Sequence, residues 1–204
     1  RDRVGVKPLY YANFGNRFAW ASELKALEDH FSERSLEMDG TALYDFLTYL
    51  YVPTPKTLYR GIYKLEPAHY LDVDVRTGRF ENRPYWNLPT KPCSLSVDEA
   101  AEELRALVRS SVSAQLMSDV PVGFFLSGGI DSSIVVAEAS KLSSAVHTYS
   151  IGFDVEGYSE TEFARIVADL FKTKHTERVL EREDVASSFD QLKEWYDEPF
   201  ADTS

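Results

Sequence analysis

Residues 122–142, VGFFLSGGIDSSIVVAEASKL, place a short apolar run, a pair of glycines and a helical pattern in direct succession. The run at residues 122–126 predicts a fully buried strand at the centre of a sheet, and the apolar residues spaced after Asp131 predict a helix ending at Leu142. Because Gly128 and Gly129 carry no Cβ, the chain can bend sharply at these two residues and a ligand can approach the backbone. The stretch therefore predicts a strand, loop and helix of an α/β protein.

The loop between this strand and helix has the donors of an anion site. Backbone N–H groups of the loop and of the first helical turn converge at the positive end of the helix, where anions bind favourably. The hydroxyls of Ser127, Ser132 and Ser133 add donors, and the carboxylate of Asp131 suits a phosphate that carries Mg²⁺. A Walker A loop would need GxxxxGK(S/T), and its lysine is missing here. The alternative interpretation is a plain turn with an Asp or Ser N-cap.

Further along the chain, strands and helices alternate. Apolar patterns predict a helix from Ser96, with Glu99 completing a capping box, a strand at 146–153, a helix at 159–171 capped by Ser159 with Glu162, and a strand at 175–180. Strands joined by helices predict a parallel sheet, whose ligands bind beyond the carboxyl ends of the strands. The loop and the end of the 146–153 strand are thereby predicted to meet at one crevice.

The N-terminal part of the chain predicts different elements. Strands are expected at 4–11 and 17–21 around a turn at 13–16, followed by a helix capped by Ser22. This hairpin has no evident partner strand, so a larger sheet is expected upstream. An amphipathic helix is predicted at 38–51, short strands with a Thr77-Gly78 turn come next, and a further helix is predicted at 183–196.

Several stretches resemble known families. SGGIDS resembles the SGGxDS loop of the ATP pyrophosphatases, the PP-loop enzymes that adenylate a substrate and release pyrophosphate. The longer SDVPVGFFLSGGIDSS is similar to the glutamine-dependent asparagine synthetases. RDRVGVKPLYY and FAWASELKAL resemble the end of the glutaminase domain of that family, a class II amidotransferase of the N-terminal-nucleophile fold, and TLYRGIYKLEPAHYL resembles the segment joining the two domains.

The resemblance implies an α/β fold: a parallel-sheet PP-loop domain, like the adenine nucleotide alpha hydrolases, preceded by the C-terminal remnant of a glutaminase domain. It divides the chain into the remnant at 1–35, a connecting segment at 36–95 and the first half of the synthetase domain at 96–204. The chain has no initiator Met, and both of its ends are expected to be cut through folded protein. The family's nucleophile is an N-terminal cysteine, which the internal Cys93 cannot replace, so the catalytic residues are expected outside this sequence.

The resemblance also implies the residues of an ATP site. The pyrophosphate end of ATP would be held by the loop, at Ser127, Gly128, Gly129, Asp131 and Ser132, with Asp131 as the Mg²⁺ ligand. Phe125, Leu126 and Ile151 match positions that pack on adenine, and plain strand core is the alternative for these three. His175 is left open between packing and chemistry. Residues 197–202 resemble a segment that returns toward the active site.

The implied reaction adenylates the aspartate β-carboxylate and transfers ammonia from glutamine to it, giving asparagine, AMP and pyrophosphate. The fragment alone is expected to be inactive, and the full-length protein is expected to be a homodimer. One alternative is a related PP-loop amidotransferase or lactam synthetase acting on another carboxylate. Another is a non-catalytic nucleotide-binding module.

Composition restricts the class of partner. The 204 residues are 44% hydrophobic and 27% charged, which is typical of globular proteins. A net charge of -11 argues against nucleic acid or an anionic membrane as a partner, since these need clustered Lys and Arg. The single cysteine excludes an internal disulfide and indicates a reducing compartment, so a cytoplasmic location is expected.

Overall fold

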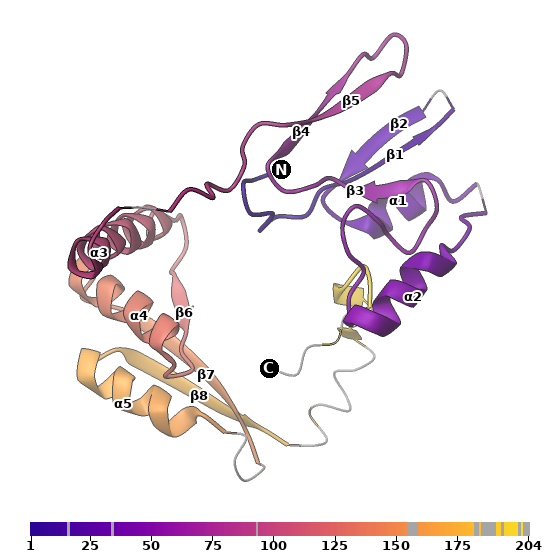
Figure 1. Ribbon diagram of the computed structural model, residues 1–204. Helices are drawn as coiled ribbons and strands as arrows, with labels where there is room; N and C mark the ends of the chain where they lie inside the picture. The colour runs from indigo at the N-terminus through magenta and orange to yellow at the C-terminus, as the bar shows by residue number, and fades with distance from the viewer. Residues whose placement is uncertain are drawn as a thin grey trace. The chain divides into compact units, whose positions relative to one another are not determined.

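The computed structural model describes residues 1–15, 17–33, 35–92, 94–154, 159–181, 184, 191–192, 194–199 and 201. The chain forms two compact units, each with its own sheet and core (Figure 1). Unit 1 comprises Arg1–Lys91 and Asp190–Ser204, and unit 2 comprises Pro92–Phe189. Within the described residues, no helix has the length and apolar character needed to cross a bilayer.

The first sheet of unit 1 is antiparallel, in the order β2-β1-β3, with β1 at Tyr10–Phe14, β2 at Arg17–Ala21 and β3 at Ile62–Lys64. The hairpin is confirmed, but the expectation that it has no partner strand is wrong, because β3 pairs with β1. Its first strand also starts later than predicted. The carboxylate of Asp2 accepts hydrogen bonds from the N–H groups of Val6 and Lys7, at 2.9 and 3.0 Å, so these amides are not part of the ladder.

Two helices accompany this sheet. Helix α1 (Leu24–His30) packs against it through Leu24, Leu27 and the adjoining Phe31. The predicted Ser22 cap is wrong, because the N-cap is Glu23 and its side chain makes no cap hydrogen bond. Helix α2 (Gly40–Tyr49) starts after the N-cap Asp39 and buries only Ala42 among its described residues. Its predicted apolar face is largely exposed.

A second, two-stranded antiparallel sheet completes unit 1, with β4 at His69–Val73 and β5 at Phe80–Pro84. The predicted Thr77-Gly78 turn is confirmed, with Gly78 in the left-handed region at φ 68°. The ring of Phe80 lies 5.7 Å from that of Tyr11 and 5.5 Å from that of Phe18, measured between centroids. Aromatic packing therefore joins the second sheet to the first.

Unit 2 contains a parallel sheet in the order β6-β7-β8, with β6 at Gly123–Phe125, β7 at His147–Phe153 and β8 at Lys174–Leu180. Helix α3 (Val97–Gln115) precedes β6, helix α4 (Ile130–Leu142) joins β6 to β7, and helix α5 (Thr161–Phe171) joins β7 to β8. The predicted parallel sheet and the Ser96 to Glu99 capping box are confirmed. The predicted central position of the first strand is wrong, since β7 is the middle strand of the described sheet.

The predicted full burial of the first strand is also wrong. Phe125 is 84% exposed, whereas Leu126, just after β6, is 2% exposed and packs with Val136 of α4 and Ala164 of α5. Successive side chains of a strand point to opposite faces of the sheet. One face of the sheet is therefore covered by α4 and α5, and Phe125 belongs to the other.

Helix α5 differs from its prediction in two ways. Its N-cap is Glu160 without a side-chain hydrogen bond, so the predicted Ser159 capping box is wrong. Phe163, Ile166 and Leu170 are exposed, while the small Ala164 and Ala168 are buried against the sheet. The predicted helix at 183–196 lies largely outside the described residues, as does Cys93.

Candidate functional site

The SGGIDS loop lies at the carboxyl edge of the parallel sheet, directly after β6. The N–H group of Leu126 donates to the Tyr149 carbonyl of β7 at 2.9 Å. The hydroxyl of the buried Ser150 donates to the Leu126 carbonyl. Two hydrogen bonds thus fix the start of the loop to the middle of β7, while the predicted crevice between the loop and the end of this strand stays a prediction.

Gly128 fits its place for two physical reasons. Its φ of 82° is in the left-handed region, which residues with a Cβ rarely occupy. A Cβ added to it would lie 2.5 Å from the Phe163 carbonyl carbon and 2.6 Å from the Ala164 nitrogen of α5. The loop therefore packs directly on the backbone of α5. Sequence reasoning missed this contact, because no local pattern signals it.

The turn into α4 is held together by serine hydroxyls. The Ser127 Oγ accepts from the Gly129 N–H at 3.3 Å and lies 3.1 Å from the Ser132 Oγ, which donates to the Gly129 carbonyl at 3.2 Å. Gly129 is the N-cap and the helix begins at Ile130, one residue earlier than predicted, so the alternative of an Asp or Ser N-cap is wrong. The N–H groups of the first turn have no intrahelical acceptors and can serve a ligand.

The loop is open to solvent. Ser127, Gly129 and Asp131 are exposed, and Gly128 and Ser132 are partly exposed. The described residues hold no cluster of three or more His, Cys, Asp or Glu side chains that could bind a metal by themselves. Mg²⁺ does not require such a cluster, because it is commonly held by one or two carboxylates together with substrate phosphates and water. The exposed Asp131 carboxylate beside the free amides fits that arrangement.

The three candidate adenine contacts are not equivalent. Ile151 is 54% exposed and, like Phe125, belongs to the face of the sheet that α4 and α5 leave uncovered. The side chain of Leu126 is buried in the opposite face, in the core beneath the helices. Phe125 and Ile151 can therefore offer side chains to a ligand, whereas Leu126 can offer only its backbone.

His175 lies away from the loop. It is the second residue of β8, near the amino end of the parallel strands. Its Nδ1 lies 2.9 Å from the hydroxyl of Thr148, which in turn lies 2.7 Å from the hydroxyl of Thr173. These contacts favour the packing role over the chemical one.

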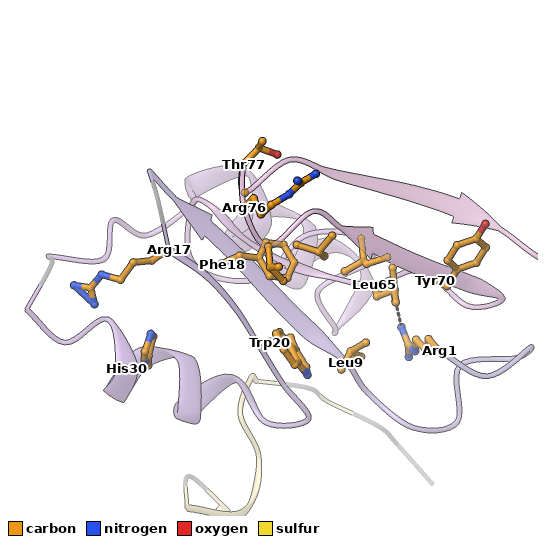
Figure 2. Close-up of a pocket in the computed structure, with 14 residues that line it drawn as sticks. Arg1, Leu9, Arg17, Phe18, Trp20, His30, Leu65, Tyr70, Arg76 and Thr77 are labelled. Atoms are coloured by element: carbon orange, nitrogen blue, oxygen red, sulfur yellow. Dashed lines mark hydrogen bonds between the residues drawn. The ribbon is translucent and has the colours of Figure 1, made fainter.

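A cavity of about 780 Å³ lies in unit 1, and all of its lining residues belong to that unit. Figure 2 shows Phe18, Trp20 and Leu65 among its walls, with Arg1 at one side. The Arg1 guanidinium is occupied by the carbonyls of Lys7, Leu65 and Gly5, at 3.0, 2.7 and 2.7 Å. None of the loop residues of unit 2 lines this cavity, and its Arg1 already has acceptors.

A glycine-rich loop between a parallel strand and a helix, at the carboxyl edge of the sheet, places unit 2 among the α/β proteins in which such an edge is the usual position of a ligand site. The comparisons with known proteins agree. The family model described as "Asparagine synthase" matches residues 103–204, and the one described as "Glutamine amidotransferase domain" matches residues 1–86. The chain belongs to the asparagine synthase family.

Three of the curated relatives each match nearly the whole chain. The chain is 38% identical over 209 residues to a Methanocaldococcus jannaschii protein provisionally named glutamine-hydrolyzing asparagine synthetase 2, covering 100% of this chain and 40% of the relative. It is 33% identical over 202 residues to the Bacillus subtilis glutamine-hydrolyzing asparagine synthetase 1, covering 99% and 32%. It is also 33% identical over 222 residues to the Gibberella zeae amidase chry2, covering 97% and 31%. The chain thus spans two fifths or less of each of these relatives.

Proposed function

We propose that this chain is part of an ATP-dependent, glutamine-hydrolysing asparagine synthetase. In the proposed reaction, an oxygen of the aspartate β-carboxylate attacks the α-phosphorus of ATP and pyrophosphate leaves. Ammonia from glutamine then attacks the acyl carbon, AMP leaves, and asparagine forms. The observation that carries the proposal is the SGGIDS loop, packed on α5 through Gly128 and leading into a helix whose first N–H groups lack intrahelical acceptors.

Within this proposal, unit 2 is a PP-loop domain. The loop residues Ser127, Gly128, Gly129 and Ser132 hold the pyrophosphate end of ATP, and Asp131 holds Mg²⁺. Phe125, Ile151 and the backbone of Leu126 contact adenine. The loop N–H groups stabilise the charge that grows on the departing pyrophosphate. We also propose the division at 1–35, 36–95 and 96–204, a homodimer and a cytoplasmic location for the whole protein.

Exchange of labelled pyrophosphate into ATP by the whole protein tests the proposal. Exchange should require aspartate and Mg²⁺, and it should be lost in Asp131→Asn. Asp119→Asn is the matched control, because it removes an exposed carboxylate that precedes β6 and lies outside the loop. Exchange that persists in Asp131→Asn, or that needs no carboxylic acid, would contradict the assignment. The 204 residues alone should form no asparagine from aspartate, ATP and ammonia.

A second candidate is amidation, or lactam closure, of a different carboxylate on the same loop chemistry. The similarity to a protein named as an amidase supports it. Exchange that depends on another carboxylic acid but not on aspartate would favour this candidate. Nucleotide binding without exchange for any acid would instead indicate a non-catalytic nucleotide-binding module.

A further inference from the structure

Two carboxylates of the second segment of unit 1, residues 190–204, bind to its first segment, residues 1–91. Asp197 Oδ2 accepts from the N–H of Leu24, the first residue of α1, at 2.6 Å. Glu198 Oε1 accepts from the N–H of Leu58 at 3.0 Å, and its other oxygen pairs with the Lys64 ammonium. We call Asp197 and Glu198 the acidic anchor. Its donors come from three separated parts of unit 1.

The anchor is largely shielded from solvent, so its pairing matters energetically. The side chains of Glu198 and Lys64 are 10% and 15% exposed, and that of Asp197 is 11% exposed. The Lys64 ammonium also donates to the Val52 carbonyl at 2.6 Å. A buried carboxylate is tolerated when such donors surround it, and removing one partner leaves the other charged and unpaired.

Burial and the negative charge of the anchor raise the pKa of two neighbouring groups. The pKa of the Tyr10 hydroxyl is raised, first by burial and then by the charges of Glu198 and Asp197. The pKa of Glu28 is raised by burial and by Asp197. The Lys25 ammonium donates to the Glu194 carbonyl at 2.9 Å and lies 3.9 Å from Asp197 Oδ1, which accepts no hydrogen bond from the described residues. Unit 1 thus presents two backbone N–H groups and two ammonium groups to one short acidic segment.

We propose that unit 1 carries a recognition surface for an Asp-Glu pair, that Asp197 and Glu198 occupy it, and that this contact is a second tether between the units. The chain leaves unit 1 for unit 2 after Lys91 and belongs to unit 1 again from Asp190. With the anchor bound, unit 2 is attached to unit 1 at both of its chain ends. Without the anchor, the two units are still joined by the chain at Lys91. A second attachment raises the effective concentration of one unit near the other without any new contact.

Hydrogen exchange in the whole protein tests the contact, because the Leu24 and Leu58 amides donate directly to the anchor. Glu198→Gln should speed exchange at Leu58, and Asp197→Asn should speed it at Leu24, by roughly tenfold or more, since charge-assisted hydrogen bonds are the strong ones. Glu194→Gln is the matched control. It removes a charge from the same segment but leaves the carbonyl that Lys25 binds.

Two further readouts separate the contact from general unfolding. Exchange at the Phe31 amide of unit 1 and at the Leu126 amide of unit 2 should not change, because their acceptors are the Leu27 and Tyr149 carbonyls. The double variant Lys64→Met with Glu198→Gln should exchange more slowly elsewhere in unit 1 than Lys64→Met alone, since it leaves no unpaired charge. Unchanged exchange at Leu24 and Leu58 in the anchor variants, or equal effects in Glu194→Gln, would overturn the contact.

The tether itself is tested by cutting the exposed segment near Leu88, which lies outside any helix or strand. After limited proteolysis there, the two fragments of the wild-type protein should elute together in gel filtration. The fragments of the double variant Asp197→Asn with Glu198→Gln should separate. Co-elution of the variant fragments, or separation of the wild-type fragments, would overturn the tether. None of these readouts depends on the proposed enzymatic activity, so the two proposals can fail independently.

Discussion

Replacing Gly128 by alanine should destabilise unit 2 far more than replacing its neighbour Gly129. The new Cβ at position 128 would be held at φ 82° and pressed to 2.5 Å from backbone and side-chain carbons of Phe163. The left-handed conformation costs roughly 1–2 kcal/mol for an L-residue. Overpacking adds about 1–3 kcal/mol. The expected loss is therefore roughly 2–5 kcal/mol, a large part of the stability of an ordinary domain.

Gly129→Ala is the matched control in the same loop. Gly129 has a φ of -68°, and a Cβ there would lie 3.4 Å from the Ser127 hydroxyl, an ordinary contact. Its cost should stay below about 1 kcal/mol, the usual effect of a poorer N-cap. The two variants differ by one position, so a difference between them reports the contact with α5.

Urea unfolding, monitored by hydrogen exchange of the amides in α4 and α5, measures this loss of stability. With a slope of about 2 kcal/mol per molar urea, Gly128→Ala should lower the midpoint of unit 2 by roughly 1–2.5 M. The three tryptophans, Trp20, Trp86 and Trp195, all belong to unit 1, so their fluorescence is an internal reference that should not move. Equal midpoints for Gly128→Ala and Gly129→Ala would refute the packing of the loop on α5.

Three further predictions use the same protein. Asp131→Asn should leave the unfolding midpoint unchanged, because the side chain is exposed, but should weaken binding of ATP with Mg²⁺ by roughly tenfold or more in calorimetry. Ser150→Ala should cost about 1 kcal/mol, visible as faster exchange at the Leu126 amide, because the Leu126 carbonyl loses its hydroxyl donor. The N–H groups of Lys7 and Val6 lower the pKa of Asp2 to about 2 from 3.8, so this carboxylate stabilises unit 1 above its ordinary pKa and stops doing so as the pH falls through about 2. Asp2→Asn should therefore flatten the acid limb of unit 1 stability, read by tryptophan fluorescence, and an unchanged limb would contradict the role of Asp2.

The elements of unit 2 could be predicted closely because their signals are local. The strands β7 and β8 and the capping box of α3 follow from apolar periodicity and from Ser96 with Glu99. The same reasoning placed the loop next to β7, since parallel strands bring their carboxyl ends to one edge. These features need only a few neighbouring residues to be specified.

The burial of side chains was predicted less well, because it depends on which other elements pack against each face of a helix or sheet. Of the apolar stripe that the spacing predicts, Val167 and Phe171 pack against the core beside the buried Ala164 and Ala168, whereas Phe163, Ile166 and Leu170 are exposed. Helix α5 approaches the loop so closely at Gly128 that a Cβ there would meet its backbone. Periodicity identifies an apolar stripe but does not say which part of it is covered.

The amino-acid sequence alone determined the strand, glycine turn and helix of the candidate site, and the alternation that makes the sheet parallel, because these depend on local spacing and on the absence of a Cβ. The tertiary structure decided that Gly128 meets α5 and that Leu126 turns its side chain into the core. It also decided that Asp197 and Glu198 bind amides 173 and 140 positions earlier in the chain. Such contacts depend on how distant segments pack, and no local pattern of residues records them.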